Sequence, residues 1–202
     1  FRQDQAPELA RMGIGVMLQP KSHYEPHVER LGFPTWAADN GCFAQGTRFD
    51  SAAFYRWLAT VPRSRLLFAV APDVYGDHEA TWRRSLPYLG EFREMGLPRA
   101  FVAQNGGRPD TVPWEYFETL FIGGDNAWHF GPMVRDLVLE ARARGKRIHM
   151  GRVNSARRLQ YAATIGCHSA DGTYLAFRNR TTTGLRDMEK LVRQGILDGL
   201  HG

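Results

Sequence analysis

The feature that most constrains the fold is an alternation of short apolar runs with amphipathic stretches. Seven such runs recur, each closed by glycine or polar residues. Near-continuous apolar runs of this length are typical of strands buried on both faces of a parallel sheet. Their alternation with helical patterns predicts parallel strands joined by right-handed crossovers. The runs cover residues 13–20, 34–41, 65–73, 98–106, 119–125, 147–153 and 166–173.

The intervening stretches place apolar side chains at helical spacing and begin or end at capping residues. Units of roughly 25 to 30 residues predict a compact (β/α)8-type TIM barrel of the α/β class, with one strand missing or irregular. The eighth strand is expected before residue 1 or at residues 8–12, unless the barrel is open. A doubly wound open sheet is the alternative. Helices are expected at residues 52–60, 77–95, 132–144, 155–165 and 185–197, and less clearly at 109–118.

Length and composition narrow the class of protein further. A chain of 202 residues without a linker, repeat or low-complexity tract is expected to form a single domain over residues 1–202. No apolar run approaches membrane-spanning length, and no apolar segment of a signal peptide follows the first residues. Two cysteines exclude a disulfide scaffold and a Cys-rich zinc site, and they fit the reducing cytoplasm. The net charge of +5 is compatible with a polyanionic partner.

Polar residues gather where the apolar runs end, which is the face on which parallel barrels collect their chemistry. Carboxylate and amide groups match the edge of a nucleobase, and an aromatic ring can stack on its face. Two carboxylates on opposite sides of a glycosidic carbon suit a nucleophile and an acid/base. Glycines at such positions let backbone N–H groups approach a ligand closely. The residues at these ends are Asp39, Phe43, Asp73, Gln104, Gly123, Gly124, Asp125, Met150, Gly151, Arg152 and Asp171.

Each of these residues also has a structural explanation that the sequence leaves open. Asp39 and Asp125 could cap the following helices, and Asp73 after a proline could belong to a turn. Met150 could be a core residue, and the two cysteines could be small buried apolar groups.

Six short motifs in chain order resemble the tRNA-guanine transglycosylase family and its DNA-acting relatives. DNGCF at residues 39–43 resembles the family's Asp-Ser-Gly-Gly-Phe, and VAQNGG at 102–107 resembles Val-Gln-Gly-Gly. APD at 71–73 resembles the family strand that reads the purine. IGG at 122–124 resembles Val-Gly-Gly-Leu, and HMG at 149–151 resembles Leu-Met-Gly. GCHSAD at 166–171, the last of the six, resembles Gly-Ile-Asp-Met-Phe-Asp. Beyond these six motifs, RNR at 178–180 resembles the Thr-Arg-Asn-Ala run that follows in the family.

The resemblance implies a barrel enzyme, a pentosyltransferase that exchanges guanine in nucleic acid for a free 7-deazaguanine derivative and needs no cofactor. It implies Asp171 as the nucleophile that forms a glycosyl–enzyme intermediate, and Asp39 as the acid/base. It assigns base recognition to Asp73, Gln104, Gly123, Gly124 and Gly151, with Phe43 and Met150 on the two faces of the base. Phosphate contacts are expected from Lys21, Arg152, Arg178 and Arg180.

The sequence also departs from the family pattern. Asn40 and Cys42 replace a serine and a glycine, and the family's Cys-x-Cys-x-x-Cys…His zinc subdomain, which helps to hold tRNA, is not found. DNA is therefore expected as the partner rather than tRNA, as in the DNA-directed relatives of phages and bacteria. The oligomeric state is not predicted.

Two alternatives come from other classes of protein. A metal-dependent barrel hydrolase could use His149, His168, Asp171 and Asp39 as ligands, although the usual His-x-His on an early strand is missing. A non-catalytic nucleic-acid-binding module would keep the basic loops but would not need both Asp39 and Asp171.

Overall fold

The computed structural model describes residues 6–20, 28, 30 and 32–172. Within them, seven parallel strands form one sheet, and their spatial order is the order of the chain. A doubly wound sheet reverses its strand order at a switch point, so this order excludes that alternative and confirms the predicted barrel-type fold. The strands are β1 (Val16–Leu18), β2 (Trp36–Ala38), β3 (Leu66–Val70), β4 (Arg99–Ala103), β5 (Thr119–Ile122), β6 (Arg147–Met150) and β7 (Ser169–Ala170).

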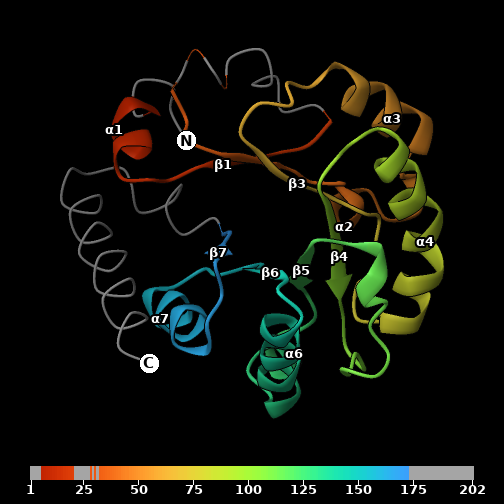
Figure 1. Ribbon diagram of the computed structural model, residues 1–202, viewed down its shortest axis with the longest axis vertical. Coiled ribbons are helices and arrows are strands. Elements are labelled where there is room, and N and C mark those ends of the chain that lie inside the picture. The colour runs from red at the N-terminus through yellow and green to blue at the C-terminus, as the bar shows by residue number, and fades with distance from the viewer. Residues whose placement is uncertain (1–5, 21–27, 29, 31, 173–202) are drawn as a thin grey trace.

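The helices surround the strands, which lie in the centre of the molecule (Figure 1). Three helices begin within one residue of the predicted starts, because Asp50, Asp77 and Ser155 accept backbone N–H groups from the first turns of α3, α4 and α7. The helices are α1 (Ala6–Arg11), α2 (Cys42–Gln45), α3 (Ser51–Thr60), α4 (His78–Glu94), α5 (Asn126–His129), α6 (Pro132–Ala143) and α7 (Ala156–Ile165), with 3₁₀ turns η3 (Gly46–Arg48) and η4 (Trp114–Tyr116).

Two details of the prediction change. Residues 8–12 do not supply the eighth strand, because most of them belong to α1. The predicted region 109–118 contains only the short turn η4. The helix expected at 185–197 lies outside the described residues. No helix in the described part of the chain is long and apolar enough to cross a membrane.

The two faces of the sheet carry different cores, since successive side chains of a strand point to opposite faces. Alternate residues such as Phe101, Leu120 and Ile148 pack outward against the helices. The residues between them form a smaller inner cluster. It contains Ala37, Phe68, Val70, Ala100 and Val102, with Met17, Leu67 and Phe121 packed against it.

The sheet curves strongly enough to bring distant strands together. β2 and β7 are five strands apart, which in a flat sheet corresponds to about 24 Å. Nevertheless the charge of Asp171, just after β7, raises the pKa of Asp39, just after β2. Curvature therefore places the carboxyl ends of β2 and β7 across the barrel interior from each other.

Candidate active site

A ring of predicted site residues lies at the carboxyl ends of the strands, next to the inner core cluster. Each member follows the last inward side chain of its strand by two residues, so strand alternation directs it to the interior side. A Cβ added to Gly123 would lie 3.0 Å from Gln104 Nε2, and one added to Gly151 would lie 3.3 Å from Asp171 Oδ1. Neither position has room for a side chain, because the Cβ atoms would also lie 2.7 Å from Val102 and 2.5 Å from Phe121. The ring consists of Asp39, Gln104, Gly123, Gly151 and Asp171.

Two buried amides fix the carboxylate of Asp73. Asn40 Nδ2 donates to Oδ1 at 3.0 Å, and Gln104 Nε2 donates to Oδ2 at 2.7 Å. Asn40 also donates to the carbonyl of Ala71 at 3.0 Å and accepts from the N–H of Cys42 at 2.6 Å. Burial raises the pKa of Asp73, and the two amide hydrogen bonds oppose that rise. The side chain is thus held in one orientation by β2 and β4.

The amide oxygen of Gln104 also accepts two hydrogen bonds. It accepts the backbone N–H of Gly124 at 2.8 Å and that of Gly76 at 3.0 Å. The N–H of Gly124 therefore holds Gln104 in this structure. Asp125, the other acid of this loop, accepts the N–H of Trp128 at 2.9 Å and caps α5, so the capping interpretation of Asp125 is confirmed.

Asp39 occupies the most unusual electrostatic position in the ring. Its half-buried carboxyl has a pKa raised to about 6, mainly by burial and further by the charges of Asp171 and Asp73, while the N–H groups of Gly41 and Asn40 lower it. Asp39 does not cap α2, because the N-cap residue of this helix is Gly41 and no side chain caps it. A carboxyl with a pKa near neutrality can both give and take a proton, which is the requirement for an acid/base catalyst.

Asp171 lies across the interior and is bonded to a buried histidine. His149 Nε2 lies 3.0 Å from Asp171 Oδ1, and its Nδ1 lies 2.8 Å from Ser169 Oγ. The imidazole packs against Phe68 and Phe121, with ring centroids 5.0 and 4.7 Å away. The sequence prediction included His149 only as an alternative metal ligand and missed this contact, which depends on the pairing of His149 with Ser169 across β6 and β7.

An aromatic and cationic cluster stands at the rim. Phe43 is 73% exposed and Tyr75 47%, and their ring centroids are 5.3 Å apart. The guanidinium of Arg152 lies over both rings and donates to Tyr75 Oη at 3.1 Å and to the carbonyl of Gly124 at 3.0 Å. Arg152 has a φ of 58°, an uncommon conformation for a residue other than glycine that often marks functional sites.

Tyr75 was not predicted. Its sequence signal is its place between Asp73 and Gly76, in a loop that follows a strand end.

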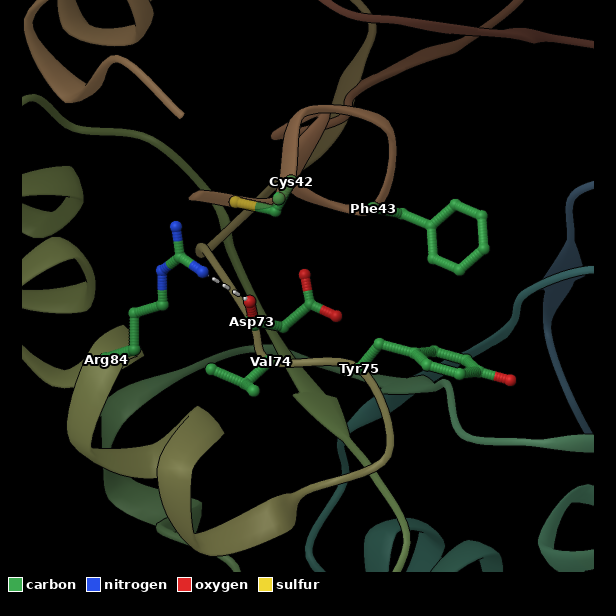
Figure 2. Close-up of a pocket in the computed structure, with 7 residues that line it drawn as sticks. Cys42, Phe43, Asp73, Val74, Tyr75 and Arg84 are labelled. Carbon is green, nitrogen blue, oxygen red and sulfur yellow. Dashed lines mark hydrogen bonds between the residues drawn. The ribbon is translucent and has the colours of Figure 1, made fainter. Parts of the chain in front are cut away.

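A cavity of about 340 Å³ opens beside this cluster. Figure 2 shows the Asp73 carboxylate directed toward the side on which Phe43 and Tyr75 lie, with Arg84 on the opposite side. Arg84 Nη1 donates to the backbone carbonyl of Asp73 at 3.0 Å. Burial raises the pKa of the Cys42 thiol to about 12, so Cys42 is a small buried group, as one interpretation of the sequence held. The lining residues are Cys42, Phe43, Gly46, Asp73, Val74, Tyr75 and Arg84.

Some predicted site residues lie elsewhere. Met150 is only 1% exposed and packs in the cluster between sheet and helices, so the predicted contact with a base is corrected to a core position. Its neighbour His149 takes the inward position, because adjacent residues of a strand face opposite ways. Lys21, Arg178 and Arg180 lie outside the described residues.

The metal-site alternative gains no support from the geometry. Within the described ranges, no group of three or more His, Cys, Asp or Glu side chains is arranged to hold a metal ion. Both ring nitrogens of His149 are within hydrogen-bond distance of protein groups, and Nδ1 of the exposed His168 accepts the N–H of Ile148 at 3.0 Å.

Comparisons with known proteins identify the fold but no family. No family model and no curated protein matches the chain. Among solved structures, the Amycolatopsis orientalis BexX/CysO complex matches with a TM-score of 0.59 at 18% identity, over 96% of this chain and 83% of that one. Ligand-free tryptophan synthase from M. tuberculosis gives 0.55 at 15% identity, over 98% and 85%. The 3-hexulose-6-phosphate synthase from Salmonella typhimurium gives 0.52 at 13%, over 96% and 94%. Identities this low speak for a shared fold alone, and none of these three names denotes a transglycosylase.

Proposed function

We propose that the protein is a pentosyltransferase that exchanges guanine in nucleic acid for a free 7-deazaguanine derivative. One observation carries the proposal. The carboxyl groups that end β2 and β7 act on each other across the barrel interior, and one of them, Asp39, has a pKa of about 6. Two carboxyls with different environments on opposite sides of one space suit a nucleophile and an acid/base at a glycosidic carbon.

The reaction divides into two displacements at C1′ of a nucleotide turned out of its stack. In the first, an oxygen of Asp171 forms a bond to C1′, the C1′–N9 bond breaks, and guanine leaves as N9 takes the proton of Asp39. In the second, the incoming 7-deazaguanine gives its N9 proton to Asp39 and forms the new bond to C1′, and Asp171 is released. The proton returns to Asp39, so the cycle balances without a cofactor.

Recognition of the base is assigned to the network around Asp73. Asp73 would accept from the N1–H and amino group of the purine, and its orientation is fixed by Asn40 and Gln104. Gly123 and Gly151 are assigned close backbone approach to the base. Gly124 would act indirectly, because its N–H holds Gln104 and its carbonyl holds Arg152. Phe43 would stack on the base from the rim.

The acceptor strand would bind over the rim. Exposed aromatic rings beside a guanidinium form a surface of the kind that binds single-stranded nucleic acid through stacking and cation–π interactions. Phe43, Tyr75 and Arg152 provide these groups, and the chain carries a net charge of +5. DNA, in the cytoplasm of a bacterium or of a phage-infected cell, remains the proposed acceptor because of the resemblance to the DNA-directed relatives.

A search for the covalent intermediate tests the proposal. The native protein is incubated with single-stranded and duplex DNA oligonucleotides and a 7-deazaguanine, and peptides are analysed by mass spectrometry. The expected result is a glycosyl adduct on the peptide that contains Asp171, together with labelled base in the DNA. Asp171→Asn should form no adduct while melting at the same temperature as the native protein. Base incorporation by Asp171→Asn would refute the assignment of the nucleophile.

A further inference from the structure

His149 is a buried, hydrogen-bonded side chain that the proposed mechanism does not use. It is only 5% exposed, and both of its ring nitrogens are within hydrogen-bond distance of oxygens, on Ser169 and on Asp171. The rings of Phe68 and Phe121, which also contact each other, pack against the imidazole and restrict its rotation. A histidine held in this way has one orientation, so its hydrogen bonds define the orientation of their partners.

The two contacts select the proton position on the ring. An unprotonated Nε2 and a carboxylate oxygen 3.0 Å apart would face each other with lone pairs, which is unfavourable. A proton on Nε2 turns this contact into a hydrogen bond. The hydroxyl of Ser169, 2.8 Å from Nδ1, can then donate to the free nitrogen. The tautomer with Nε2–H therefore satisfies every group in the chain from Ser169 to Asp171.

The contact distinguishes the two oxygens of Asp171. Oδ1 faces Nε2 of His149 and also lies beside the position that a Cβ of Gly151 would occupy. A hydrogen bond withdraws electron density from the oxygen that accepts it and holds that oxygen in place. Among the described residues, the side-chain contact is to Oδ1, so the second oxygen, Oδ2, is the one assigned to approach a sugar carbon.

We infer that His149 is a positioning residue that donates its Nε2–H to Oδ1 of Asp171 and so presents Oδ2 as the attacking atom. The inference rests on the proposed role of Asp171 as nucleophile. His149 itself touches neither sugar nor base in this scheme. Ser169 acts one step further away, by keeping the proton of a neutral imidazole on Nε2.

The position of the proton can be measured without any substrate. Long-range ¹H–¹⁵N spectra of the native protein labelled at histidine report each ring nitrogen, and His149→Gln identifies the signals that belong to His149. We expect a proton on Nε2. A proton on both nitrogens would keep the donation to Asp171 and would also support the inference. A proton on Nδ1 alone would overturn it.

The effect on the reaction separates positioning from a merely structural role. His149→Phe keeps an aromatic ring against Phe68 and Phe121 but removes the donor, and the rate of adduct formation should fall about 10²-fold. The concentration of DNA that gives half the maximal rate should not change. His149→Gln, whose amide can donate from a position similar to Nε2, should recover part of the rate. An unchanged rate in His149→Phe would overturn the inference.

Two control variants complete the test. Ser169→Ala should slow adduct formation less than about tenfold, because Nε2 can still donate. A loss as complete as that of Asp171→Asn would instead make Ser169 the nucleophile and overturn the inference. His168→Gln changes an exposed histidine adjacent to Ser169 and should leave the rate unaltered. If the native protein forms no adduct with DNA, the proposed function fails, and the NMR result still decides whether His149 donates to Asp171.

Discussion

The carboxyl groups on the two sides of the barrel rim have different surroundings. On the side of β2 to β4, Asp39 faces the charges of Asp73 and Asp171 and is partly buried, and its pKa rises to about 6. On the side of β6 and β7, Asp171 faces a histidine nitrogen at 3.0 Å. One side is therefore suited to exchanging a proton, and the other to holding an oxygen in a fixed direction.

The difference arises from the neighbours and not from the strands. Both acids follow a short strand by one residue and point inward, and both are partly exposed. What differs is the burial that raises the pKa of Asp39, and whether the adjacent strand provides an acid or a donor. Division of labour between two carboxyls of the same type follows from such neighbours.

The largest expected effect comes from replacing Asp39, the acid that exchanges a proton with the base. Asp39→Asn should lower base exchange about 10²- to 10⁴-fold, because the amide cannot take the N9 proton of the incoming base. In the native protein, the kcat/KM for that base should rise with pH through about 6 and then level off, since Asp39 must be ionised to accept the proton. The variant should lose this rise.

Asp125→Asn is the matched control, since Asp125 is another acid at the rim but caps α5. An identical pH profile in native protein and Asp39→Asn would show that the two sides do not differ as described.

The next effect tests the other side of the rim. Gly151→Ala would place a Cβ 2.5 Å from Cε1 of Phe121 and 3.3 Å from Asp171 Oδ1. The ring of Phe121 must then move, and the packed His149 and Asp171 must move with it. We expect a loss of about 10²-fold in the rate of adduct formation.

Gly90→Ala serves as the control, because a Cβ there meets nothing within 4 Å. It should keep full activity and slightly stabilise α4. Equal rates in Gly151→Ala and Gly90→Ala would contradict the tight packing around Asp171.

The third effect concerns stability and has a definite sign. The folded protein raises the pKa of Asp39 from 3.8 to about 6, so folding favours the protonated acid. This penalty is absent below about pH 4, grows between pH 4 and 6, and is complete above that range. Asp39→Asn should therefore raise the free energy of unfolding by about 2 kcal/mol at pH 8 and by little at pH 4. Urea unfolding at the two pH values measures this, and an equal change at both would show that ionisation is not the cause.

The smallest expected effect concerns the binding of single-stranded DNA at the rim. Tyr75→Ala removes one of the two exposed rings beside Arg152 and should weaken binding of single-stranded DNA by about 1 kcal/mol. Fluorescence anisotropy at fixed salt gives the Kd. Tyr116→Ala removes a ring of similar exposure from η4, in the loop that leads into β5, and should leave the Kd as it was. Equal Kd values in Tyr75→Ala and native protein would exclude Tyr75 from the surface that binds nucleic acid.

Much of the fold could be predicted because its signal is local. Each strand lies within an apolar run, and the capping residues of α3, α4 and α7 are short-range features of the sequence. The inward position of Asp39, Gln104 and Asp171 also follows from the places where the strands end.

Other parts depend on pairing between distant residues. Met150 and His149 are neighbours in the sequence, and only the register of β6 decides which of them faces inward. The approach of His149 to Ser169 spans 20 positions and has no local pattern. Tyr75 lies in a loop, where strand periodicity gives no information about direction.

The shortness of β7 has a consequence for how the protein acquires activity. Ser169 and Ala170 pair with His149 and Met150, and these two pairs define the register of the strand. A slip of one residue would turn Asp171 toward the helices and bring an apolar side chain to the interior. Such a slipped form would retain its compactness and helix content, yet it would be inactive. Recovery of activity after refolding would therefore report on strand register, which probes of secondary structure do not detect.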